Sequence, residues 1–149
     1  MQSALVIGYG NTLRSDDGAG PKVAEVLAEA GTAVLLRHQL VPELADELKH
    51  CTIVVFVDAV ATLTPGAVAI RQIAAEAAAD GSDASGLTHH CSPETLLLLA
   101  DRLYGARPRA YLVTLGAASF ELGDELSSAV AAAVPVAAAA VRQLIEAPG

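Results

Sequence analysis

Short apolar runs alternate with amphipathic segments along this chain, and the alternation predicts strands and helices in turn. Apolar runs that predict strands lie at 4–7, 33–36, 53–57, 67–73 and 109–115, and the unbroken run 4–7 is typical of a strand buried on both faces. Helical spacing or helix-start signals mark the segments 21–30, 42–50, 93–104 and 126–145. The pattern predicts an α/β fold with three αβα layers, in which helices cover both faces of a five-stranded, mostly parallel twisted sheet.

Local signals refine this picture at several positions. Pro21 suits a first helical turn and Gly31 a helix end, while Ser92 is placed to cap the helix that stops at Gly105. The run 67–73 contains Arg71 and Gln72, which places it near an edge of the sheet. The alanine-rich, acidic stretch 74–86 has no clear periodicity, and we expect a mobile loop there. The 149 residues are 53% hydrophobic, as expected for one domain that covers the whole chain.

A glycine-rich stretch with two adjacent acids separates the first strand from the first helix. It runs from Gly8 to Gly20 and contains Asp16 and Asp17. Sites in α/β sheets lie in the loops after strand carboxyl ends, where two carboxylates can bind a metal, move protons or accept hydrogen bonds. The acids could instead cap the helix or favour its dipole. We expect Asp16 to point to solvent or to the loop, and Asp17 to point into the site.

A dinucleotide site is the lesser alternative for this stretch. Leu13 stands where the third glycine of that fingerprint belongs, and the helix begins late, near residue 20. The two acids would also repel a pyrophosphate. Arg37, near the end of the second strand, could meet a 2′-phosphate, which leaves an NADP site as an alternative.

Further polar residues are expected at the same edge of the sheet. Asp58 directly follows the run 53–57, and His89 and His90 precede the helix capped by Ser92. Together with the first-loop acids they would form an N/O site that suits Zn, Ni, Mn or Fe. Asp58 could instead be held by N–H groups of its own turn, and the histidine pair could lie in a solvated loop. Cys91 could join the site or be an ordinary buried thiol.

Charge and composition exclude some classes of partner. The net charge of −8 argues against a nucleic acid or an anionic membrane as partner. Cys51 and Cys91 form no metal-type pair and suggest no disulfide framework, and we interpret His38 and His50 as solvated. The uncharged stretch 126–141 is short and contains Pro135, so we expect a packed terminal helix and no membrane span. The chain shows no signal-peptide pattern, and we expect a cytoplasmic protein.

The motifs resemble those of the hydrogenase maturation proteases. The resemblance depends on the following residues: Gly8-x-Gly10-Asn11-x-Leu13-x-x-Asp16-Asp17-Gly18-x-Gly20, Asp58-Ala59, Thr88-His89, the strand 111–115 and Phe120-Glu121-Leu122-Gly123. The resemblance implies an endopeptidase that trims the C-terminal extension from the large-subunit precursor of a [NiFe] hydrogenase. It also implies a metal held by Asp17, Asp58 and His89, with His89 preferred to His90. The metal that the resemblance implies is nickel, already inserted in the precursor and therefore supplied by the substrate, and no organic cofactor is implied.

The resemblance leaves the mechanism and one loop open. Many members carry Asp-Gly-Gly-Thr after the second strand, where this chain has 37–43, with Gln39 and Glu43 able to approach the site. The metal could polarise the scissile carbonyl or activate a water, or Asp17 or Asp58 could act as general base. The alternative function is a non-catalytic nickel-binding checkpoint that docks on the precursor without cutting it.

Overall fold

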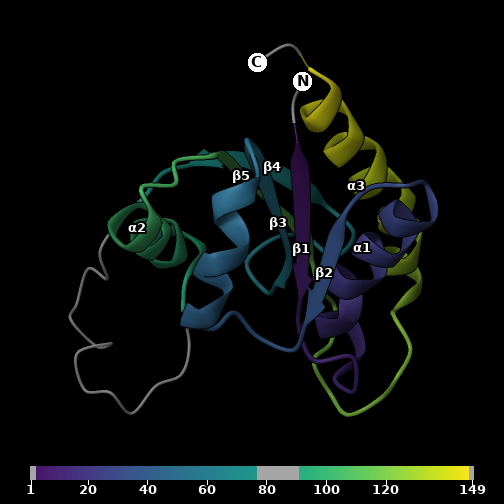
Figure 1. Cartoon of the computed structure of the whole chain (residues 1–149). Coiled ribbons are helices and arrows are strands. Elements are labelled where there is room, and N and C mark those ends of the chain that lie inside the picture. The colour runs from purple at the N-terminus through teal and green to yellow at the C-terminus, as the bar shows by residue number, and fades with distance from the viewer. Residues whose placement is uncertain (1–2, 77–90, 148–149) are drawn as a thin grey trace, which may run out of the picture.

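Five strands form one twisted sheet at the centre of the molecule (Figure 1). The computed structural model describes residues 3–76 and 91–147. The strand order is β2-β1-β3-β5-β4, and only β4 runs antiparallel to its neighbour. The strands are β1 (Ala4–Tyr9), β2 (Val34–Arg37), β3 (Ile53–Val60), β4 (Val68–Ile73) and β5 (Arg109–Gly116). The predicted five-stranded, mostly parallel sheet is confirmed, with the run that contains Arg71 and Gln72 at its edge.

Helices cover both faces of this sheet. They are α1 (Ala19–Glu29), α2 (Pro93–Tyr104), α3 (Ser128–Glu146) and the 3-10 helices η1 (Ser15–Gly18) and η2 (Pro42–His50). The segment predicted as a short helix at 42–50 is therefore helical, in the tighter 3-10 form. The three-layer αβα architecture is confirmed, with α1 and α3 on one face and α2 and η2 on the other (Figure 1).

The two-residue period of the strands divides the core between these faces. Val6 of β1 packs in the cluster under α1 and α3, whereas its neighbour Ile7 packs in the cluster under α2 and η2. In the central strand β3, Val55 and Phe56 divide in the same way, and both are fully buried. A strand apolar on both faces is thus explained by a helical layer on each side.

The predicted helix ends are confirmed by their hydrogen bonds. Ser92 caps α2 by accepting the Thr95 N–H at 3.0 Å, and Gly105 ends that helix with a left-handed φ of 67°. Gly31 follows α1 with φ of 93°. There the Gly31 and Thr32 N–H groups donate to the carbonyls of Ala28 and Leu27, which is a Schellman motif.

The last helix, α3, is the one helix in the described ranges that is long and apolar enough to cross a membrane by length and composition. Its inward face lies in the core and packs against α1 and β5. Pro135 lies inside the helix, and Ser127 caps its start. The loop expected at 74–86 falls mostly outside the described residues.

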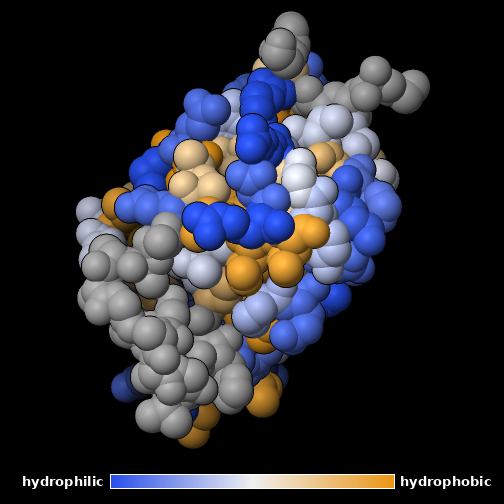
Figure 2. Space-filling view, turned by 60° about the vertical axis from the view of Figure 1, so that its left-hand side comes forward, coloured by the Kyte–Doolittle hydropathy of each residue, from blue (hydrophilic) through white to orange (hydrophobic). Residues whose placement is uncertain are grey.

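Figure 2, in which the α2 side comes forward, shows a largely hydrophilic surface with a small hydrophobic patch near its middle.

Candidate functional site

The carboxyl ends of β1 and β3 diverge and open a crevice between them. The two strands pair from Ala4↔Ile53 to Gly8↔Val57, after which β1 leads into the glycine-rich loop while β3 continues along β5. The chain passes from β1 to β2 on one side and returns to β3 on the other. This is the topological switch point at which α/β sheets bind ligands.

The glycines of the first loop bring backbone into direct contact with backbone. A Cβ on Gly20, in the first turn of α1, would collide with the Val57 and Tyr9 carbonyls, and one on Gly10 would collide with the Asp17 carbonyl. Gly10 also has φ of 149°, which side chains rarely adopt. Close packing of α1 on the sheet therefore accounts for the glycine spacing without a bound nucleotide.

Asp16 is fully buried, which corrects the expectation that it faces solvent or an open loop. Its carboxylate accepts hydrogen bonds from the N–H groups of Ala118, Ser119 and Ser127 and from the Ser127 hydroxyl, at 2.7–3.1 Å. Burial alone would raise the pKa of Asp16, but these hydrogen bonds hold the pKa below its usual value. Asp16 is thus a buried anchor between η1 and the segment that precedes α3.

Asp17 lies at the crevice, as predicted. Its Oδ2 accepts the N–H of Asn11 at 2.8 Å, which closes the loop around the carboxylate. Neither acid caps α1, because its N-cap position, Gly18, has no side-chain cap bond. The helix-capping alternative for this pair is therefore wrong.

Asp58 lies inside β3 and not after it, because pairing with β5 continues to Val60↔Gly116 and pairs Asp58 with Thr114. Its Oδ1 accepts the Ala59 N–H at 2.8 Å, and the Tyr9 hydroxyl donates a second hydrogen bond. Burial raises the pKa of Asp58 to about 7 with help from the nearby Asp17 charge, although both hydrogen bonds oppose the shift. Burial and Asp58 also raise the pKa of Tyr9, which keeps its phenol a donor.

Asp17 and Asp58 line the same pocket, of about 330 Å³. Its other lining residues come from the first loop, from the segment after β2 and from the residue before the Ser92 cap: Tyr9, Gly10, Asn11, Arg14, His38, Gln39, Leu40 and Cys91. The expected approach of Gln39 is confirmed, whereas Glu43 does not line the pocket. The two acids that the sequence singles out are therefore brought together by the fold.

Two pocket residues were missed by the sequence reasoning. Tyr9 ends β1, one residue beyond its last partner in β3, and its phenol reaches Asp58. His38 is exposed, as expected, yet it lines the pocket because β2 ends beside β1. The signal for both was the position at a strand end, the same signal that identified Asp58.

His89 and His90 lie outside the described residues, so the histidine of the proposed set stays a prediction. Within residues 3–76 and 91–147, no three His, Cys, Asp or Glu side chains gather closely enough to hold a metal ion. The described residues thus offer a pair of carboxylates, and further ligands would be needed to hold a metal ion. Carboxylate oxygens with nitrogen ligands suit Ni and Zn, so the donor chemistry fits a metal that brings further ligands of its own.

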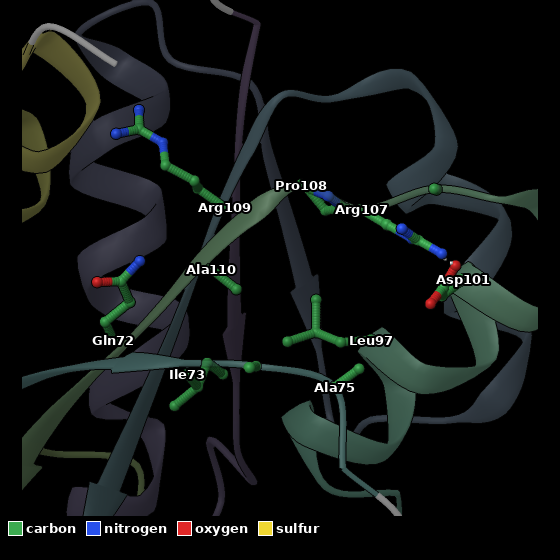
Figure 3. A pocket seen from close by; sticks show the side chains of 11 residues that line it. Gln72, Ile73, Ala75, Leu97, Asp101, Arg107, Pro108, Arg109 and Ala110 are labelled. Atoms are coloured by element: carbon green, nitrogen blue, oxygen red, sulfur yellow. Dashed lines mark hydrogen bonds and ion pairs between the residues drawn. The ribbon is translucent and has the colours of Figure 1, made fainter.

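A second pocket, of about 310 Å³, lies where β4 ends and β5 begins (Figure 3). Leu97, Ile73 and Ala110 form its buried apolar lining, and Arg107 pairs with Asp101 at its rim at 2.9 Å. In Figure 3 the Arg109 side chain points away from it. It contains none of the acids that the sequence motifs mark, so we place the chemistry at the crevice of Asp17 and Asp58.

Comparison with solved structures places this fold among the hydrogenase maturation proteases. The chain matches the [NiFe] hydrogenase maturation protease HybD from Thermococcus kodakarensis with a TM-score of 0.75 and 27% identity, over 97% of this chain and 99% of that chain. It matches a hydrogenase 2 maturation peptidase from a Thaumarchaeota archaeon with a TM-score of 0.68 and 27% identity, with the same coverage. The maturating endopeptidase HybD from E. coli shares the fold, with a TM-score of 0.68 and 24% identity over 95% of this chain and 93% of that chain.

No protein-family model and no curated protein matches the sequence. The resemblance read from the motifs is nevertheless confirmed by structure, because the fold matches these proteases over nearly the whole of both chains.

Proposed function

We propose that this chain, a structural relative of the [NiFe] hydrogenase maturation proteases, is an endopeptidase that removes the C-terminal extension of a nickel-loaded hydrogenase large-subunit precursor. The observation that carries the proposal is the convergence of Asp17 and Asp58 on one pocket at the switch point of this fold. The sequence separates these carboxylates by 41 positions, and only the pairing of β1 with β3 unites them.

Asp58 is suited to proton transfer. A general base works best when its pKa lies near the working pH, and burial raises the pKa of Asp58 to about 7. Tyr9 hydrogen-bonds to this carboxylate and acts as a positioning residue, because its raised pKa keeps the phenol protonated. Asp58 would accept the proton of the attacking water and return it to the leaving amine.

Asp17 is suited to electrostatic recognition of the precursor. Its Oδ2 is tied to the Asn11 N–H, so the carboxylate is held in place before substrate arrives. Nickel reaches the pocket as part of the precursor, and Asp17, Asp58 and His89 would complete its ligand set. The bound metal would polarise a carbonyl or lower the pKa of a water. Cleavage then depends on a correctly loaded precursor.

The test is mass spectrometry of the large-subunit precursor from the same organism, with and without nickel, after incubation with this protein. We expect loss of a C-terminal peptide from the nickel-loaded precursor only. Asp58→Asn should lower the rate by roughly 10²–10⁴-fold, the range for a lost acid–base group. Asp17→Asn should also block cleavage, because it removes the carboxylate that would receive the metal. Asp46→Asn, at an exposed acid of η2 that lies outside this pocket, is the matched control and should cleave normally.

Histidine variants decide the third member of the set. His89→Ala should block cleavage and His90→Ala should be mild, and the reverse result would exchange their roles. Stable binding of the loaded precursor without any mass loss would reject the protease and support the non-catalytic checkpoint.

A further inference from the structure

Two loops that lie far apart in the sequence join beside the candidate site. The loop after β1 and the segment before α3 both lie at the lower end of the sheet in Figure 1, and a bridge between Arg14 and Gly123 joins them. The Gly123 N–H donates to the Leu13 carbonyl at 2.9 Å, and the Ser15 N–H donates to the Gly123 carbonyl at 2.8 Å. The Ser15 hydroxyl donates to the Glu121 carbonyl at 2.7 Å, and Asp16 anchors the pair from below. These hydrogen bonds fix the two loops relative to each other.

The joined loops present large apolar side chains to solvent. Leu13 is 64% exposed, Leu122 is 78% exposed and Phe120 is 37% exposed. The hydrogen bonds of these loops are made by backbone and by small polar groups, so folding does not require leucine at either tip. Apolar side chains that are exposed on a pre-organised surface are a mark of an interaction site.

This apolar surface is continuous with the candidate site. Arg14 forms the bridge to Gly123 and also lines the pocket of Asp17 and Asp58. The Asp17 N–H donates to the Arg14 carbonyl at 3.1 Å, so the catalytic loop and the apolar surface share one backbone turn. A macromolecule that places a peptide bond in the pocket would therefore come close to the apolar surface.

The charges behind the surface define the chemistry of its partner. A groove of about 480 Å³ lies between the joined loops and α1, and Glu25, Asp124 and Glu125 line it together with Lys22. Lys22 already pairs with Glu25 at 3.4 Å. The groove keeps an excess of negative charge, which favours a partner with lysine or arginine near its apolar side chains.

The geometry points to a docking surface for the hydrogenase large-subunit precursor, formed by Leu13, Phe120 and Leu122 with the acidic groove of Glu25, Asp124 and Glu125. Its occupant is a precursor segment with apolar side chains flanked by lysine or arginine. This inference rests on the proposed function and extends it, because the surface would hold the body of the precursor while the scissile bond lies at Asp17 and Asp58.

The test compares exposed leucines on the docking surface with an exposed leucine elsewhere on the molecule. Leu13→Ser and Leu122→Ser should each raise the KM for the nickel-loaded precursor about tenfold, with little change in kcat, because loss of an interfacial leucine weakens binding. Leu103→Ser on α2, at a leucine 63% exposed, is the matched control and should leave KM unchanged. Glu125→Lys should also raise KM, whereas Glu29→Lys, at the far end of α1, should not. Thermal unfolding should be unaffected by either serine substitution in the loops.

Direct binding measurements separate failure of this inference from failure of the proposed function. Biolayer interferometry with the same precursor should show about tenfold weaker binding for Leu13→Ser and Leu122→Ser, whether or not cleavage occurs. If the wild-type protein binds without cleaving and the variants bind more weakly, the surface stands and the protease fails. If cleavage proceeds with KM and affinity unchanged in both variants, the surface is refuted and the protease stands. If the wild-type protein does not bind the precursor, both are refuted.

Discussion

Three aspartates near the carboxyl end of the sheet have three different environments. Asp16 accepts four hydrogen bonds in the interior, Asp17 accepts one from its own loop, and Asp58 is partly buried beside Tyr9 and Asp17. The pKa of Asp16 is lowered, while that of Asp58 is raised to about 7. Asp16 therefore has a structural role, whereas Asp17 and Asp58 are the candidates for chemistry.

The raised pKa of Asp58 makes stability depend on pH. Between the unfolded pKa near 4 and the folded pKa of about 7, the native state keeps a proton that the unfolded chain releases, so stability falls as pH rises through this range. The full shift corresponds to at most roughly 4 kcal/mol. Asp58→Asn cannot titrate but keeps an oxygen for Ala59 and Tyr9.

We therefore expect Asp58→Asn to be more stable than wild type at pH 8, with a difference that shrinks towards pH 5. Urea unfolding at both pH values measures it, and Asp124→Asn serves as control. A difference that stays constant with pH would contradict the raised pKa.

Asp17 and Asp58 follow the buried apolar runs of β1 and β3, which predicted from the sequence that they lie close together, but the role of Asp16 was not predictable. The hydrogen-bond donors to Asp16 lie 102 to 111 positions away in the chain. No local pattern connects an acid to backbone N–H groups at that separation. The tandem of two acids therefore predicted a site without indicating that Asp16 would be buried away from it.

At the scale of elements, local rules succeeded where the deciding contacts are local. The Ser92 cap and the glycines after α1 and α2 depend on residues within one turn, and all were predicted. The end of β3 was misplaced because a charged residue after an apolar run suggests a strand end. The strand instead continues through Asp58, because β5 supplies partners as far as Gly116.

The first turn of α1 gives a prediction at this scale. Gly20→Ala would place a methyl group against the Val57 and Tyr9 carbonyls, so α1 and the adjoining η1 must shift. We expect a loss of about 1–3 kcal/mol in the free energy of unfolding, as for overpacked sites, together with reduced cleavage because Asp17 moves.

Gly105→Ala is the control at a glycine with open space around it and a left-handed φ. It should cost about 1 kcal/mol from backbone strain alone and leave cleavage intact. Denaturant unfolding and the cleavage assay measure both variants. Unchanged stability and activity in Gly20→Ala would show that close packing at this turn is not required.

At the scale of the whole molecule, the central strand of the sheet is buried from solvent more completely than the edge strands. Residues 53–57 of β3 are fully buried, with parallel neighbours on both sides, whereas β2 and β4 lie at the edges. The alternation of elements predicted the layers, and Arg71 and Gln72 predicted the edge position of β4. The insertion of β5 between β3 and β4 was not predictable, because it depends on a segment much later in the chain.

The rate of amide hydrogen exchange should rise from the central strand to the edge strands. Amides of β3 should exchange most slowly and those of β4 much faster, because opening an edge strand disrupts fewer contacts. Mass spectrometry of peptides that span each strand provides the measurement. Equal protection of β4 and β3 would contradict the arrangement.

The buried carboxylate of Asp16 also has a consequence for the time at which the protein becomes active during synthesis. A ribosome makes the first loop early, but the N–H groups that donate to Asp16 belong to residues 118–127, which are made 102 to 111 positions later. Until those residues emerge, the loop that carries Asp17 has no anchor. A nascent chain of this protein therefore holds the loop that carries Asp17 unassembled, and the ability to cleave arises only after residues 118–127 have also been made.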